Sequence, residues 1–120
     1  MPASKQEVTK LTAIGYARRS KQRGARIASL EQQVARIRAC CEIQGWAVAR
    51  VVTDDGVSSG RREPWLADLV LALEADPLAK RVVVPAEVLA WLEAEAPDSW
   101  RRVVAWFEAR GVRVVEVPPG

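Results

Sequence analysis

The most informative feature of this 120-residue sequence is an absence, because it contains no histidine. Without histidine there can be no Ser-His-Asp triad, no Cys-His pair and no zinc site built on histidine ligands. Any catalysis by this chain must therefore use serine, arginine, aspartate or glutamate side chains.

Cysteine is scarce, and the two cysteines, Cys40 and Cys41, are neighbours in a stretch with helical periodicity. Adjacent side chains on a helix diverge, so a disulfide between them is disfavoured. We expect two reduced thiols in or near the core.

Long apolar runs are also missing. No segment of 18 consecutive apolar residues exists, and the first ten residues, MPASKQEVTK, are polar and lack the apolar stretch of a secretory signal. The sequence therefore predicts a cytoplasmic protein with no membrane partner.

The composition is that of one folded domain, with 49% apolar and 28% charged residues. We expect a flexible tail over residues 1–10 and a domain over residues 11–120. Lys and Arg number 18 against 15 Asp and Glu, a net charge of +3, and arginine dominates the basic residues. Because arginine suits bidentate phosphate contacts, this balance permits nucleic acid as a partner without requiring it.

Hydrophobic periodicity predicts alternating strands and helices. Strands are expected at residues 11–17, 47–53, 81–84 and 112–117, and helices at residues 29–45, 64–76, 86–96 and 98–110. Ser29 followed by Gln32 is typical of a capping box, and Gly45 of a helix end. Short connections between such elements favour parallel strands, so we predict a three-layer, Rossmann-like α/β domain with a four-stranded, mainly parallel sheet.

Ligands of such sheets bind at the carboxyl ends of the strands. Two of the loops expected there, over residues 18–28 and 54–63, are rich in Arg, Ser and Gly. The two loops could meet around a phosphate group.

Four motifs fall in and beside these loops: YARRS (16–20), SLEQQ (29–33), DDGVSSG (54–60) and EPWL (63–66). Their order and spacing resemble the catalytic domain of the serine recombinases, the resolvase and invertase family, over about residues 12 to 117. The resemblance implies a resolvase-like fold and DNA strand exchange through a phosphoserine intermediate. It implies no metal and no nucleotide cofactor.

The resemblance also implies a role for each matching residue. Ser20 would be the nucleophile and Arg18 its activating or phosphate-clamping partner, because a serine hydroxyl is a poor nucleophile and the charge that develops on phosphorus needs cations. The supporting residues would be Gln33, Asp54, Ser58 and Arg62. Arg19 and Arg61 would contact DNA phosphates.

Three positions depart from the family pattern. Glu63 stands where the family has an arginine, although Arg62 is adjacent, and Val88 and Trp91 stand at two further arginine positions that follow Glu87. We therefore predict an impaired site. The sequence also stops after the fourth strand, so dimerisation and DNA targeting are expected to need other means.

The main hypothesis is a catalytically impaired domain that acts as a regulatory or interaction module, binding a protein, a second copy of itself or, weakly, DNA phosphates. The alternative is an active domain that uses Ser20 and Arg18 together with a separate DNA-binding partner. In this alternative Arg19, Arg61 and Arg62 would supply the missing positive charge. A generic nucleotide-binding domain is disfavoured because no G-x-G-x-x-G or G-K-[ST] loop is present.

Simpler interpretations of single features also stay open. Residues 18–20 alone fit a solvated strand end, and residues 54–59 alone fit an ordinary turn. Trp91 and Trp106 fit either a covered sheet edge or a protein-facing surface.

Overall fold

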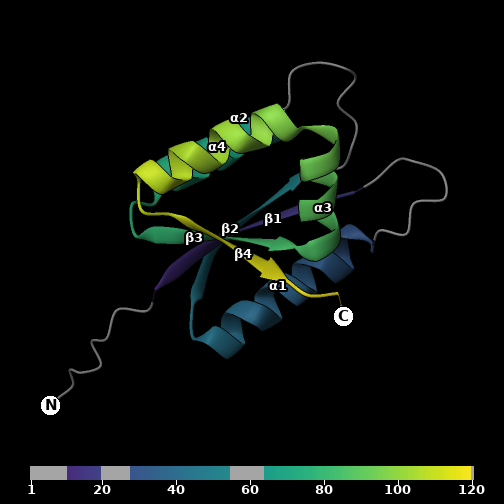
Figure 1. The fold of residues 1–120 in the computed structure, drawn as a ribbon. Coiled ribbons are helices and arrows are strands. Elements are labelled where there is room, and N and C mark those ends of the chain that lie inside the picture. Colours follow the sequence, from purple (N-terminus) through teal and green to yellow (C-terminus); the bar gives the residue numbers. More distant parts are fainter. Residues whose placement is uncertain (1–10, 20–27, 55–63, 120) are drawn as a thin grey trace, which may run out of the picture.

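The computed structural model describes residues 11–19, 28–54 and 64–119, which form an α/β fold (Figure 1). In chain order the elements are β1 (Thr12–Arg18), α1 (Leu30–Gln44), β2 (Ala47–Asp54), α2 (Pro64–Ala75), β3 (Ala79–Pro85), α3 (Ala86–Glu95), α4 (Pro97–Ala109) and β4 (Arg113–Val117). The predicted order of strands and helices is confirmed, with β3 starting two residues earlier than expected.

The strands form one sheet in the order β2-β1-β3-β4, and all three pairings are parallel. This confirms the predicted four-stranded sheet. The carboxyl ends of the strands therefore share one edge, and the register of β1 with β2 places Arg18 directly opposite Asp54.

Helices cover both faces of the sheet, as predicted for three layers (Figure 1). Helix α1 packs on one face over a small cluster that includes Ala13, Ala17 and Val83. The other face is covered by α2, α3 and α4 over a larger cluster whose biggest fully buried side chains are Tyr16 and Phe107. Because successive strand residues point to opposite faces, Tyr16 and Arg18 belong to the α3 side of β1.

The start of α1 is fixed by the predicted capping box. The main-chain N–H of Gln32 donates to Ser29 Oγ, and the main-chain N–H of Ser29 donates to Gln32 Oε1, each at 3.1 Å. Gly45 ends the helix with φ of 79°, in the left-handed region that favours glycine. The capping box sets the rotation of the first turn, which directs Gln33 inward to complete burial.

Both cysteines are free thiols, with Cys41 buried and Cys40 partly buried. Burial raises the pKa of the Cys41 thiol to about 11. It is therefore a core thiol, as expected, and is protonated at neutral pH.

Trp106 lies on α4 beside the predicted apolar stripe, and it packs partly against the larger core cluster. Its ring meets Phe107 edge to face at 6.0 Å, and the Arg110 guanidinium lies 3.9 Å from its centroid. The chain itself thus covers much of this indole. Within the described residues, no helix is long and apolar enough to span a bilayer.

At Gly15, β1 approaches α1 closely. A Cβ atom at this position would lie 2.8 Å from Ile37 Cγ2 and 3.3 Å from Val51 Cγ2. We predict that Gly15→Ala lowers the free energy of unfolding by about 1–3 kcal/mol through overpacking. Urea denaturation measures this change.

A double variant supplies the control. If the clash is the cause, Gly15→Ala should cost clearly less in an Ile37→Ala background, where the obstructing Cγ2 is gone. An equal cost in both backgrounds would contradict this origin.

Candidate functional site at the carboxyl edge of the sheet

The polar centre of this edge is an ion pair between neighbouring strand ends. Arg18 Nη1 donates to Asp54 Oδ2, and the two side chains are 15% and 8% exposed. Parallel pairing of β1 with β2 brings these residues together although they are 36 positions apart in the chain. Partial burial shields the pair from water and strengthens it relative to a surface pair.

Trp91 covers one face of the same guanidinium. Cζ of Arg18 lies 3.7 Å from the centroid of the indole ring. Helix α3 follows β3 without a loop, so it carries Trp91 over the carboxyl edge of the sheet. A cation–π contact that is partly desolvated contributes about 1–2 kcal/mol.

Gln33 holds the main chain of Arg18 from the opposite side. Its Oε1 accepts from Arg18 N at 2.9 Å, and its Nε2 donates to the carbonyl oxygens of Arg18 and Ala28, each at 2.8 Å. This fully buried amide thus joins the end of β1 to the approach to α1. The supporting role predicted for Gln33 corresponds to this contact, which fixes the main chain two residues before Ser20.

Tyr16 adds a second polar contact to Asp54. The Tyr16 hydroxyl donates to Asp54 Oδ2 at 3.5 Å, a long hydrogen bond. Desolvation by burial is the main reason why the pKa of Tyr16 is raised well above its usual value. The hydroxyl therefore stays protonated and remains a donor to the carboxylate.

A second arginine–carboxylate pair lies on the α1 side of α3. Arg36 donates to both carboxylate oxygens of Glu87, at 2.6 and 3.0 Å. Its Nη2 also donates to the carbonyl oxygens of Pro118 at 2.9 Å and Val117 at 3.4 Å. Arg36 therefore ties together α1, the start of α3 and the segment after β4.

The structure brings three of the predicted site residues together: Arg18, Gln33 and Asp54. Arg19 is close along the chain and donates its main-chain N–H to the Asp54 carbonyl at 2.8 Å, while its side chain is exposed. The other predicted residues, Ser20, Ser58, Arg61 and Arg62, lie outside the described residues, as does Glu63. The idea that Arg61 and Arg62 supply missing charge thus remains a prediction.

The two α3 positions that depart from the family pattern have different surroundings. Val88 is fully buried in the larger core cluster, whereas Trp91 is partly exposed and contacts Arg18. The sequence did not indicate two residues that contribute to the site: Tyr16, which donates to Asp54, and Arg36, which is paired with Glu87. The alternation of Tyr16 with Arg18 on β1 could have indicated Tyr16, but nothing in the sequence links Arg36 to Glu87.

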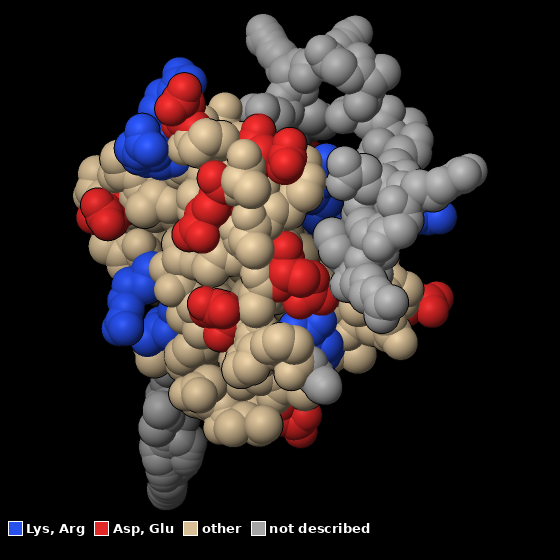
Figure 2. Space-filling model, turned by 45° about the vertical axis from the view of Figure 1, so that its right-hand side comes forward, with Lys and Arg blue, Asp and Glu red and all other residues tan. Residues whose placement is uncertain are grey.

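Charge on the nearby surface is mixed. On the face shown in Figure 2, acidic side chains are scattered over the centre among uncharged residues, and basic side chains lie mostly nearer the margins. A nucleic-acid backbone approaching this face would meet charges of both signs. Among the described residues, no group of three or more His, Cys, Asp or Glu side chains could hold a metal ion.

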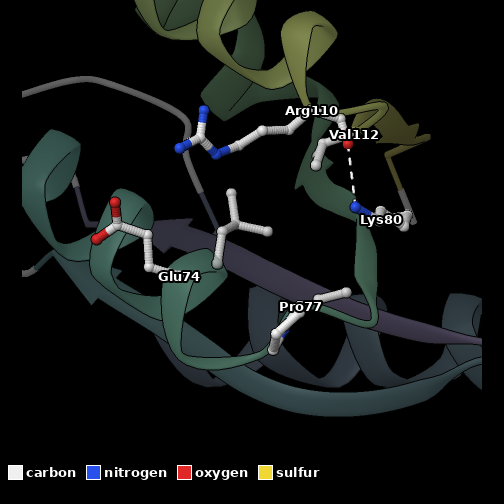
Figure 3. A pocket seen from close by; sticks show the side chains of 7 residues that line it. Glu74, Pro77, Lys80, Arg110 and Val112 are labelled. Atoms are coloured by element: carbon white, nitrogen blue, oxygen red, sulfur yellow. Dashed lines mark hydrogen bonds between the residues drawn. The ribbon is translucent and has the colours of Figure 1, made fainter.

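A hollow of about 260 Å³ lies at the opposite edge of the sheet (Figure 3). Its lining includes Glu74, Lys80 and Arg110, and Lys80 Nζ donates to the Arg110 carbonyl at 3.0 Å. This hollow is built from the starts of β3 and β4 and the ends of α2 and α4. It contains none of the motif residues, so it is separate from the candidate site.

Known proteins show similarity over most of the chain. A family profile described as "Resolvase, N terminal domain" matches residues 13–117, from the second residue of β1 to the last of β4. Among solved structures, the chain is similar to the C-terminal catalytic domain of IS1535 TnpA, an IS607-like serine recombinase. The two share 30% sequence identity with a TM-score of 0.58, and the match covers 89% of this chain and 71% of that chain. No curated protein matches the sequence.

We predict that Gln33→Leu lowers the free energy of unfolding by about 2–4 kcal/mol, because buried main-chain groups of Arg18 and Ala28 lose their partner. Gln44→Leu, at an exposed position of the same helix, is the matched control. Chemical denaturation compares the two variants. Equal stability would show that the amide is dispensable.

The Arg36–Glu87 pair predicts a pH dependence of stability. Hydrogen bonding from Arg36 is the main reason why the pKa of Glu87 is lowered. A carboxyl group with a lowered pKa in the folded chain adds stability above its unfolded pKa, near 4.3. That contribution is lost as the pH falls through the lowered value.

Glu87→Gln should accordingly destabilise the chain by about 1–2 kcal/mol at pH 7 and reduce the loss of stability on acidification. Thermal unfolding between neutral and acidic pH measures both effects. Glu93→Gln, at an exposed position of α3, should leave the pH profile unchanged. A Glu87→Gln profile parallel to that of the wild type would exclude this pair as a source of acid sensitivity.

Proposed function

This chain belongs to the resolvase N-terminal domain family, and from that membership we propose a serine-recombinase-type domain that is impaired in strand exchange and acts as a regulatory or interaction module. Its fold and family support descent from a domain that attacks DNA phosphodiesters with a serine. We propose that this chain retains little of that strand-exchange activity. The alternative is a domain that still cleaves DNA.

The observation that carries the proposal is the absence of positive charge at two positions of α3. The recombinase resemblance places arginines at residues 88 and 91, where this chain has a fully buried valine and an indole packed against Arg18. Neither side chain can neutralise an oxygen of a phosphodiester transition state. Arg18 itself is already paired with Asp54.

The size of the loss can be estimated from the chemistry. Removing one well-placed donor to a charged transition state slows a reaction by about 10²- to 10³-fold. Loss of two cationic positions should therefore slow strand exchange by on the order of 10⁴-fold or more. A loss of this size favours a function that does not depend on strand exchange.

Binding without exchange remains available to such a domain. The exposed Arg19 side chain follows the end of β1, where it could contact a DNA phosphate. The low net charge of +3 favours weak, salt-sensitive contact over strong binding. A protein partner or a second copy of the chain could supply the remaining contacts.

One observation favours the alternative. Gln33 fixes the main chain of Arg18 from both its N–H and its carbonyl, and Ser20 is two residues further on. A rigid support beside a nucleophile is what covalent catalysis needs. In an active domain Ser20 and Arg18 would act with Arg19, Arg61 and Arg62.

A covalent-adduct assay separates the two functions. The full chain is incubated with a nicked duplex library of random sequence, so that no particular recombination site has to be known, and protein–DNA adducts are counted after denaturation. We predict that wild type and Ser20→Ala give the same background. An adduct that forms with wild type and is lost in Ser20→Ala would establish the active alternative.

A further inference from the structure

The guanidinium of Arg18 already holds an anion that belongs to the chain. Asp54 Oδ2 accepts from Arg18 Nη1, and the Asp54 side chain is only 8% exposed. The same oxygen accepts from the protonated Tyr16 hydroxyl. The carboxylate is thus fixed by two donors from β1, one charged and one neutral.

Trp91 constrains the guanidinium in a different direction. Anions bind a guanidinium in its plane, along the edges that carry the N–H groups, whereas an aromatic ring packs on its face. The centroid of the Trp91 ring lies 3.7 Å from Arg18 Cζ, so the ring packs on one face of the guanidinium. The N–H edges of the guanidinium are left for anions. Among the described residues, Asp54 is the anion that binds the Arg18 guanidinium at such an edge.

We propose that Asp54 is a resident competitor for DNA phosphate at Arg18, and that Trp91 holds the guanidinium in position whichever anion is bound. This inference deepens the proposed function by describing how phosphate access is controlled at the same site. A phosphate group must displace a carboxylate that is shielded from water and held by Tyr16. The resting chain therefore has low affinity for phosphate although Arg18 is retained.

The Arg36–Glu87 pair offers a comparison within the same molecule. It too joins an arginine to a partly buried carboxylate, here Glu87 on α3, but Arg36 also donates to the carbonyl oxygens of Val117 and Pro118. Removing the Glu87 charge leaves Arg36 held by these main-chain groups. Glu87→Gln is therefore the matched control for removing the Asp54 charge.

The test measures pyrophosphate binding by the full chain at constant ionic strength, from the shift in thermal midpoint with concentration. Wild type and Glu87→Gln should bind no more tightly than Arg18→Gln. Asp54→Asn should bind on the order of tenfold or more tightly, because the competing charge is gone. The gain should vanish in Asp54→Asn/Arg18→Gln.

Two further variants sharpen the assignment. In the Asp54→Asn background, Trp91→Phe should retain the gain and Trp91→Ala should lose most of it, because phenylalanine still offers an aromatic face. The thermal midpoint of each variant without pyrophosphate gives its own loss of stability, so the change in pyrophosphate affinity is compared separately from the change in folding. If Trp91→Ala retained the full gain, the positioning role of the indole would be overturned.

A short random-sequence duplex tests whether DNA is the relevant source of phosphate. Asp54→Asn should retain this duplex at low salt more strongly than wild type, in an Arg18-dependent manner. A gain for pyrophosphate without a gain for the duplex would contradict DNA phosphate as the ligand. Asp54→Ser, which also removes the charge, serves if Asp54→Asn does not fold.

Two results would overturn the competition itself. One is Arg18-dependent pyrophosphate binding by wild type as tight as that of the Asp54 variants. The other is a folded Asp54 variant that gains no affinity. These results are independent of the adduct assay, since a Ser20-dependent adduct would contradict impaired strand exchange without bearing on which anion occupies Arg18 in the resting chain.

Discussion

The parallel pairing of β1 with β2 is the constraint on which the candidate site depends. It places Arg18 opposite Asp54 at the carboxyl edge of the sheet, so that a guanidinium and a carboxylate meet where both strands end. Gln33 then fixes the Arg18 main chain, and Trp91 fixes the plane of its guanidinium. Each of these three contacts comes from a different element of the fold.

Two guanidinium groups at this edge are neutralised by carboxylates of the same chain. Arg18 is paired with Asp54 and Arg36 with Glu87, and both pairs are partly buried. A partly buried guanidinium left without an anion would be costly, so these pairs support the fold as well as shaping the site. Under the proposal above, the Asp54 carboxylate takes the position at Arg18 that a DNA phosphate would otherwise occupy.

Local patterns were enough to predict the elements and part of the site. Period-two and period-3.6 spacing, Ser29 with Gln32, and Gly45 placed the strands and helices. The rule for parallel sheets placed the loops that begin at Arg18 and Asp54 at the same edge of the sheet. What the sequence could not show were contacts set by packing over long separations. Arg36 reaches Glu87 across 51 positions, and Trp91 reaches Arg18 because α3 starts at the end of β3. The residue type at one position does not show which residue of a helix far away in the sequence will contact it in the folded chain.

The central claim is that the groups of this chain, and not phosphate, hold Arg18. The most direct measurement is the NMR spectrum of the Arg18 guanidinium in the full chain, recorded with and without duplex DNA at physiological salt. The account predicts slowed rotation about the Cζ–Nη bonds and a ring-current shift from Trp91, both unchanged by DNA. A freely rotating guanidinium in the free chain, or Arg18 resonances that move as duplex is added, would contradict it.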